Sequence, residues 1–437
     1  MSHTRAALTA AVIALCGVVI TPPRSSALDL EGALRQATAA NPTLAARDAM
    51  VEAAQRRVGP AGAWSSPMVE LGAVNVPTDG RFDTDPMTMK MIGVTQRVPV
   101  FGANRLARGA ARAEVRGESA AAEMTAFEIW GLTWQAYADA YYAGELARLA
   151  DAHGAVMEHM ILSARARYES GNGRLEDILR AQAEQARTFA DLASLRAEER
   201  GARARLDALR GVMPGAGADS LAPPPAVAVP PTPDAWLAAI APSHPRLRER
   251  QAQVDRYRLS ARAARRMVWP DLELHGSYGR REPLAGLTPQ DDMFSATVAF
   301  MLPIFAGSRE RSEAAGMEAM ARVSEAERKA AELDLIAQVA AVHATAAAAQ
   351  RTVGLLADTV VTTQRRASDA SWVSYRAGAT DLWRVFESTH ALYSEEIALV
   401  RARQELARAA AQMLTLTGRG DLLGVALPTA PRPRSER

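Results

Sequence analysis

The sequence predicts a mainly α-helical chain built as two copies of one unit, each a long coiled-coil hairpin joined to a pair of membrane β-strands. Three observations predict this class. The motif "YESGNGRLEDIL" at Tyr168 returns as "YRAGATDLWRVF" at Tyr375, at an offset of 207 (375 − 168). Long Ala- and Arg-rich segments without proline flank both motifs, and that composition favours helix. Shorter segments that alternate apolar with polar residues precede them, and this period of two indicates strands.

The duplication extends along the chain. "NPTLAARDAM" beginning at Asn41 matches "HPRLRERQAQ" beginning at His244, at an offset of 203 (244 − 41). "VPVFGANR" around Pro99 matches "LPIFAGSR" around Pro303, at an offset of 204 (303 − 99). Matches in the same order at nearly constant offset identify a repeated structural unit.

These matches divide the chain into segments. A first repeat covers 28–211 and a second covers 234–418, and each closes with a glycine after an apolar run. The connection 212–233 between them is too rich in proline and glycine to be a helix or a central strand. The C-terminal tail, 419–437, has the same extended character, and residues 1–27 are expected to be a cleaved signal peptide.

The signal peptide rests on the N-terminal pattern. The apolar run 6–20 is shorter than the roughly 20 residues that a membrane-spanning helix needs. Small residues precede the expected cleavage after Ala27. The alternatives are an uncleaved anchor and acylation at Cys16, and Leu15 stands against acylation because a small residue is needed before the cysteine.

Composition excludes several classes of protein. The formal net charge is +2 over 437 residues, so no strongly basic surface favours nucleic acid. The chain has 1 cysteine, which leaves the mature protein no disulfide and no thiolate metal site. The 7 histidines are scattered without close carboxylate partners, and each is interpreted as structural or solvated. We therefore predict no catalytic, metal or cofactor site and no enzymatic activity.

Each repeat opens with a helix, predicted from Leu30 to about Gly59 and from Asp234 to about Met267. A strand pair follows, at about 68–98 and about 271–302. The strands run about ten residues, which suits tilted membrane strands, although a small soluble sheet remains the alternative. Four strands are too few to close a barrel, because known single-chain barrels begin at about eight. If these are membrane strands, several chains are therefore expected to complete one barrel.

Two helical hairpins complete the units, at about 102–210 and about 306–417. Each ascending helix of about 65 residues is predicted to span about 95 Å. Gly171 and Gly378 are expected to supply the positive φ that ends the ascending helices. In the returning helix of the second hairpin a coiled-coil seam repeats every seven residues. Its members are Val385, Leu392, Leu399, Leu406 and Met413.

This plan resembles the TolC family of outer-membrane efflux proteins over essentially the whole mature chain. The resemblance rests on the "NP" and "HP" openings, the "VPVFG" and "LPIFAG" strand exits and the two tip motifs. It implies a homotrimer with a twelve-strand barrel and a periplasmic helical tunnel. It also implies two partners, a periplasmic adaptor protein and an inner-membrane efflux pump.

The resemblance also suggests where such a channel closes. Family members close the periplasmic end with an Asp on the first hairpin and a Tyr on the second, which match Asp177 and Tyr375. Inward acidic positions on the second hairpin match Arg384 and Glu387. Arg384 departs from the family's acid and is interpreted either as part of the constriction or as a partner of Glu387 within the helix. Tyr168, the counterpart of Tyr375, completes the gate candidates, and ordinary solvated tip residues are the alternative.

Within the family, the stretch "DPMTMKMIGVTQRVPVFG" is most similar to outer-membrane components of heavy-metal efflux systems of the resistance-nodulation-division type. Met87, Met89 and Met91 alternate, so they are expected to share one face of a strand. Thioether ligation of Cu(I) or Ag(I) is one interpretation, and a lipid-facing apolar stripe is the favoured one. The function that the resemblance implies is a passive outer-membrane conduit for heavy-metal ions. The alternatives are a multidrug or type I secretion channel and a periplasmic coiled-coil adaptor.

Overall fold

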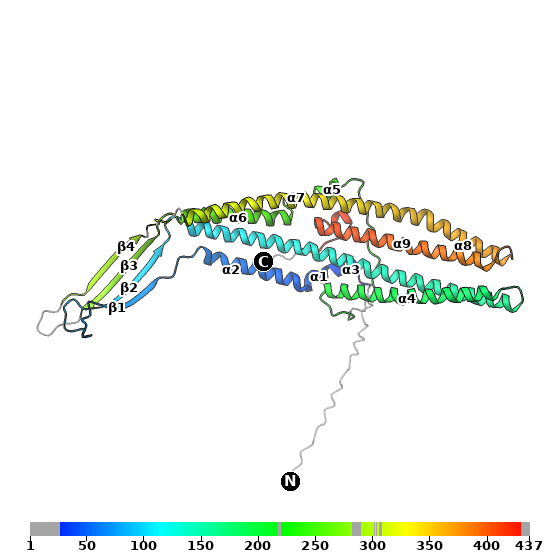
Figure 1. Cartoon of the computed structure of the whole chain (residues 1–437), viewed down its shortest axis with the longest axis horizontal. Coiled ribbons are helices and arrows are strands. Elements are labelled where there is room, and N and C mark those ends of the chain that lie inside the picture. The colour runs from blue at the N-terminus through cyan, green and yellow to red at the C-terminus, as the bar shows by residue number, and fades with distance from the viewer. Residues whose placement is uncertain are drawn as a thin grey trace, which may run out of the picture.

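The computed structural model describes residues 27–216, 220–240, 242–281, 290–300, 302, 304–305 and 308–429. The described part is strongly elongated, with a β-sheet at one end and the tips of two helical hairpins at the other (Figure 1). The predicted signal peptide with Cys16, and Pro303 at the second strand exit, lie outside the described residues.

One antiparallel sheet unites the strands of both repeats in the order β1-β2-β3-β4. The two repeats meet at the β2–β3 ladder, which runs from Met89 opposite Arg281 to Val98 opposite Leu272. Neither β1 nor β4 has a second partner strand among the described residues, so the sheet has two open edges. The strands are β1 (Met68–Val74), β2 (Met89–Val98), β3 (Leu272–Arg281) and β4 (Met293–Phe300).

The two faces of the sheet differ in chemistry. On one face a row of large apolar side chains crosses all four strands: Leu71 lies opposite Ile92, Ile92 opposite Tyr278, and Tyr278 opposite Phe294. The other face carries polar rows, such as Glu70, Gly93, Ser277 and Ser295. Directly paired residues point to the same side, so this separation is a property of the register.

Methionines lie on the polar face. Met91 pairs with Gly279, and a Cβ on Gly279 would meet the Met89 sulfur at 3.1 Å and Met91 Cγ at 3.5 Å. Glycine at this position therefore makes room for both methionine side chains. Met87 precedes β2 and is exposed. The expected stripe of three methionines on one strand is therefore wrong, because Met87 is outside β2. Met89 and Met91 share the face of Ser277.

The ascending arms of the two hairpins have equal length. Helix α3 (Ala103–Glu169) is continuous over 67 residues. The second arm consists of α7 (Glu310–Leu355), a π-helical turn η1 (Leu356–Val360) and α8 (Val361–Arg376), which follow one another without a break. The starts of the two arms are 207 residues apart (310 − 103), and so are their ends (376 − 169). Neither proline nor glycine occurs in η1, and nothing in its local sequence explains this turn.

The returning helices are α4 (Leu175–Leu209) and α9 (Leu382–Thr417). Gly171 has a φ of 77° and Gly378 a φ of 73°, a region that costs glycine nothing and other residues a steric clash. The Asp381 carboxylate accepts a hydrogen bond from the Arg384 backbone N–H and so caps α9.

Each predicted opening helix is in fact two helices. The first repeat contains α1 (Leu30–Ala40) and α2 (Pro42–Ala61), and the second contains α5 (Asp234–Leu237) and α6 (Pro245–Arg266). The single helices predicted from Leu30 and Asp234 are therefore wrong. A proline at the first position of α2 and of α6 lacks the N–H that a continuous helix needs, and it biases the preceding residue toward extended backbone.

The duplicated "NP" and "HP" openings perform the same task in both repeats. The Asn41 side chain caps α2 by accepting from Thr43 N at 2.9 Å, and it donates to Leu209 O at 3.0 Å. The His244 ring accepts from Arg246 N at 3.3 Å and lies 2.9 Å from Leu416 O. A neutral ring protonated at Nε2 satisfies both contacts, and burial lowers the pKa of His244. Each opening thus ties a helix start to the end of the returning helix.

Replacing Asn41 with alanine is expected to destabilise the first repeat. The loss of a helix cap costs about 0.5–2 kcal/mol, and the lost bond to Leu209 O adds about 1 kcal/mol. The urea midpoint for loss of helical circular dichroism should therefore fall. Thr43→Ala is the matched control, because the Thr43 side chain is exposed and makes no hydrogen bond within the described structure, where only its backbone N–H is used. Equal midpoints for the two variants would contradict the assigned role.

The main core lies in the middle of the molecule, where α1, α3, α7 and α9 meet. Trp134, Tyr137 and Leu335 are fully buried there. Two smaller clusters continue toward the tips, one around Met157 and Met160 and one around Ala147, Ala150, Leu192 and Tyr393. No helix in the described part of the chain is long and apolar enough to span a bilayer.

Candidate functional site

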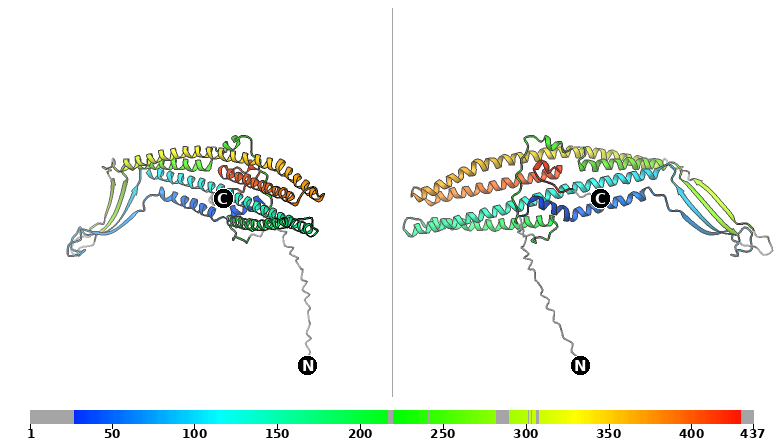
Figure 2. Two further views of the ribbon diagram at one scale, coloured as in Figure 1. Left: turned by 45° about the vertical axis from the view of Figure 1, so that its right-hand side comes forward. Right: turned by 180° about the vertical axis from the view of Figure 1, so that it is seen from behind.

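The two hairpin tips lie side by side at the end of the molecule far from the sheet (Figure 2). A cleft of about 370 Å³ opens between them, bounded by α3, α4, α8 and α9. Most of its lining is polar. The charged residues that line it are Arg167, Arg174, Glu176, Asp177, Arg180 and Asp381.

Tyr375 joins the second hairpin to the first. It is 7% exposed, and its hydroxyl lies 3.2 Å from Ser163 Oγ of α3. The Arg167 guanidinium lies over the ring, 4.9 Å from its centroid. A cation over an aromatic face is attracted by the ring's electron density. Tyr375 therefore holds α8 against α3 by a polar and a cation–π contact.

Asp177 lies in the first turn of α4, where the helix dipole favours a negative charge. It lines the same cleft as Tyr375, and both Arg174 and Arg180 line that cleft as well. Within the single chain, the Asp177 carboxylate makes no hydrogen bond or ion pair with the described residues. The Asp177–Tyr375 contact between neighbouring hairpins therefore stays a prediction.

Arg384 and Glu387 lie one turn apart on α9, and both are exposed. No ion pair joins them in the described structure, so the predicted alternative of pairing within the helix is not what this chain shows on its own. Tyr168 is 47% exposed, in contrast to its buried counterpart Tyr375. The tyrosine of the repeated motif is therefore covered in the second hairpin and open in the first.

A second contact between the hairpins was not predicted from sequence. The Arg180 guanidinium of α4 lies 4.7 Å from the ring centroid of Trp383 on α9. Arg180 also pairs with Glu176 one turn before it. Trp383 stacks on Phe386, with ring centroids 4.9 Å apart, and Phe386 stacks on His390 at 5.9 Å. This aromatic row runs along α9 from the tip toward the sheet.

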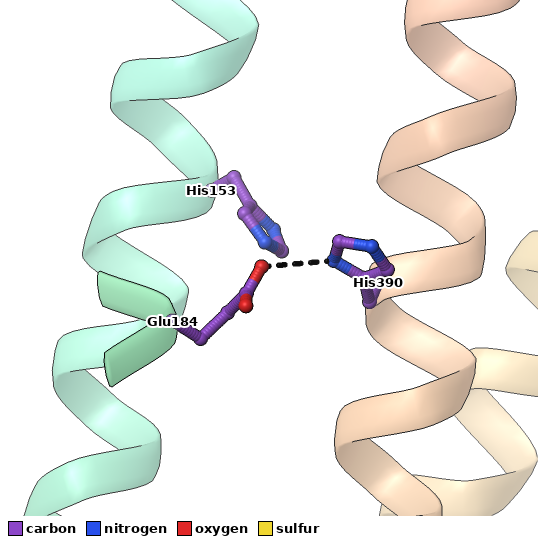
Figure 3. A group of neighbouring side chains, drawn as sticks. All are labelled: His153, Glu184 and His390. Atoms are coloured by element: carbon purple, nitrogen blue, oxygen red, sulfur yellow. Dashed lines mark ion pairs between the residues drawn. The ribbon is translucent and has the colours of Figure 1, made fainter. Parts of the chain in front are cut away.

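The row ends at a cluster of His153, Glu184 and His390, which come from α3, α4 and α9 (Figure 3). Figure 3 shows the three side chains pointing toward one another, with the carboxylate close to both rings. His390 Nδ1 lies 3.2 Å from a Glu184 carboxylate oxygen. One potential ligand atom from each residue lies within 4.8 Å of the others.

His153 is the buried member of the cluster. It is 5% exposed, and its Nε2 has no hydrogen-bond partner in the described part of the chain. Its ring stacks flat on Tyr393, with centroids 4.0 Å apart. Burial, and secondarily the nearby His390, lowers the pKa of His153 to about 4, so the ring is neutral at physiological pH. An unpaired buried polar atom costs about 1–3 kcal/mol, so the free Nε2 requires an explanation.

Sequence reasoning missed this cluster because it judged each histidine alone. The three residues come from helices that are far apart in sequence and meet only when the hairpins pack. One signal was present in the sequence. Glu184 falls at the helical spacing of the apolar side of α4, whose buried members include Ile178, Ala181, Thr188 and Leu192. A carboxylate on a buried helix seam indicates a polar partner on a neighbouring helix.

Comparison with known proteins identifies the class. The family model for outer membrane efflux proteins matches residues 33–212 and 236–419, which correspond to the two repeats. The chain belongs to this family, and the predicted resemblance to the TolC family is confirmed. A curated relative, the outer membrane efflux protein BepC of Brucella suis, is 25% identical over 425 residues, which cover 96% of this chain and 92% of BepC.

Solved structures show the same fold. The outer membrane protein VceC of Vibrio cholerae matches with a TM-score of 0.73 and 18% identity, covering 89% of this chain and 96% of VceC. The open-state MtrE outer membrane channel of Neisseria gonorrhoeae matches with a TM-score of 0.74 and 18% identity, covering 89% of this chain and 88% of MtrE. The predicted fold class is thereby confirmed.

Family membership settles the coarse function. The protein is an outer-membrane efflux channel that extends into the periplasm. It is a passive channel and not an enzyme. The alternative of a periplasmic coiled-coil adaptor is therefore excluded.

Proposed function

We propose that three copies of this chain form one channel, and that this channel is the outer-membrane conduit of a tripartite system that exports heavy-metal ions. Its partners are a periplasmic adaptor and an inner-membrane pump of the resistance-nodulation-division type. The observation that carries the proposal is the four-stranded sheet with an apolar face and two open edges.

The open edges support an assembly of several chains. Unpaired backbone groups in hydrocarbon cost several kcal/mol each, so a membrane sheet must close on itself. On the apolar face, Leu71 is 79% exposed, Phe294 74% and Val298 62% in the single chain. Such exposure suits contact with lipid. Pairing of β4 of one chain with β1 of the next would close a twelve-strand barrel with this face outward.

The tips support the same assembly. Within one chain, Tyr375 is covered by α3 of the neighbouring hairpin. Its counterpart Tyr168 remains open. In a closed ring of alternating hairpins, Tyr168 would be covered by the second hairpin of the next chain. The unequal exposure of two equivalent residues is what one subunit of such a ring requires.

The polar face of the sheet supports metal ions as cargo. Thioethers and imidazole are ligands for soft metal ions such as Cu(I). In a closed barrel with the apolar face in lipid, this face lines the lumen. The side chains of this kind that share it are Met68, Met89, Met91, His275 and Met293.

Two measurements test the proposal. Native mass measurement in mild detergent is expected to give three chains, and a stable monomer that needs no detergent would overturn the assembly.

A strain that lacks the protein should become sensitive to copper, silver or other soft metal salts. The combined variant Met89→Leu and Met91→Leu should restore resistance only in part, and Ile92→Leu on the apolar face is the matched control. Sensitivity to antibiotics with unchanged metal tolerance would assign a multidrug channel instead.

A further inference from the structure

We propose that His153, Glu184 and His390 form a binding site for one divalent transition-metal ion of the zinc class, which clamps the first hairpin to the second. Two imidazoles and one carboxylate are a ligand set that Zn²⁺ takes in proteins. The site is in the helical region, far from the sheet. The proposal depends neither on the exported cargo nor on the number of chains in the channel.

The geometry is close to that of a tetrahedral site. Ligand atoms at the usual zinc distances of about 2.0–2.2 Å lie about 3.3 Å from one another. The His390 and Glu184 atoms are already 3.2 Å apart, and all three ligand atoms lie within 4.8 Å. His153 is held by its stacking on Tyr393, whereas the His390 side chain is 46% exposed. The distances from the His153 atom to the other two, at most 4.8 Å, are therefore the ones that metal binding would shorten.

The free Nε2 of His153 points independently to a ligand. Only 5% of this residue is exposed, yet its Nε2 has no hydrogen-bond partner among the described residues. An imidazole nitrogen that carries no proton offers a lone pair to a metal ion. A metal ion would use that lone pair and remove the unsatisfied polar group.

The surroundings allow a cation. Glu184 is 9% exposed, and its second carboxylate oxygen lies 3.3 Å from the Arg187 guanidinium. The Arg187 side chain is 76% exposed and extends into solvent. The remaining oxygen faces His390 and is the one available to a metal ion. The exposed edge of His390 leaves room for water as a fourth ligand, as in zinc sites that keep one open position.

The consequence is mechanical. His153 and Glu184 belong to the first hairpin and His390 belongs to the second. A bound ion would add a link between hairpins that already meet through packing and through polar contacts such as the Arg408–Asp139 ion pair. Because the ion binds only when the hairpins are packed, it stabilises that arrangement over any in which they separate.

Titration of the purified full chain with Zn²⁺ tests the site. The protein is produced without a polyhistidine tag, stripped with a chelator in mild detergent, and titrated against a chromogenic zinc indicator. We expect one ion per chain. His390→Gln and Glu184→Gln should each weaken binding by roughly tenfold or more. His159→Gln is the matched control, because His159 is exposed on α3 and outside the cluster.

Two further measurements, of the thermal midpoint and of Co²⁺ absorption, test the same site. Zn²⁺ should raise the thermal midpoint of the wild-type chain and of His159→Gln, and it should leave that of His390→Gln unchanged. Co²⁺ bound by the wild-type chain should show the visible absorption of a four-coordinate site, and His390→Gln should lose it. Absence of stoichiometric binding, or equal affinity in His390→Gln and wild type, would overturn the proposal.

Discussion

The double variant that combines Asp177→Ala with Tyr375→Phe is expected to raise the single-channel conductance of the assembled channel severalfold. The same double variant should let large antibiotics cross the outer membrane. It should still form the assembly, because the sheet and the main core are far from the tips. Conductance in planar bilayers is the primary measurement.

The expected effect follows from the cleft between the hairpins. The Tyr375 hydroxyl contacts Ser163, and Asp177 lines the same cleft among arginine side chains. A charge-assisted hydrogen bond contributes about 1.5–3 kcal/mol where water is limited, and less where it is exposed. Each loss of about 1.4 kcal/mol from the closed state shifts the population tenfold toward the open one. Several chains around one pore multiply the shift.

Glu169→Ala is the matched control for this experiment. Glu169 is an exposed acid at the end of α3, and it does not line the cleft. Its removal changes the charge of the tip without touching the contact between hairpins. If the assembled double variant and the control conduct alike, the gate lies elsewhere, and Arg384 and Glu387 become the residues to test.

Phe294→Arg is expected to abolish insertion of the channel into the outer membrane. Phe294 is on the apolar face of the edge strand β4 and is 74% exposed in the single chain. An arginine that faces lipid costs about 2–4 kcal/mol per chain at the middle of the bilayer and less toward the interfaces. Assembly of several chains multiplies this cost within one barrel. Heat-stable oligomer in isolated outer membranes is the measurement.

Ser295→Arg provides the control, because Ser295 is the next residue of β4 and points to the opposite face. The same charge then lies in the lumen, where water solvates it, and assembly should proceed. Comparing the two variants distinguishes an effect of the apolar sheet face from a general intolerance of arginine in this strand. Equal loss of oligomer in both variants would contradict the assignment of the faces.

The duplicated architecture was predictable because local sequence patterns determine its helices and turns. The helical arms follow from long segments without proline, and the turns at Gly171 and Gly378 from glycine at the end of each arm. The breaks before α2 and α6 were also encoded, by an Asn or His cap followed by proline, but helix composition on both sides hid them. The π turn η1 carries no local signal at all.

The candidate sites were harder to predict, for a physical reason. Residues such as His153 and His390 acquire a role only when two hairpins pack, and periodicity in one helix says nothing of the helix opposite. Tyr168 and Tyr375 have the same motif, and only the structure shows that one is covered and the other open. The facing of Met89 and Met91 depended on the register of the sheet, which the sequence pattern did not set.

The equal length of the two ascending arms limits how this protein can change over evolution. Each arm is 67 residues long and therefore fixes a distance of about 100 Å between the membrane and the tips. A single-residue deletion in α3 alone would move its turn by about 1.5 Å and rotate it by about 100° relative to the turn after α8. Insertions or deletions that lengthen or shorten this channel must therefore occur in both repeats together and comprise nearly whole helical turns. Related channels of different reach should differ by matched insertions at equivalent places in the two halves.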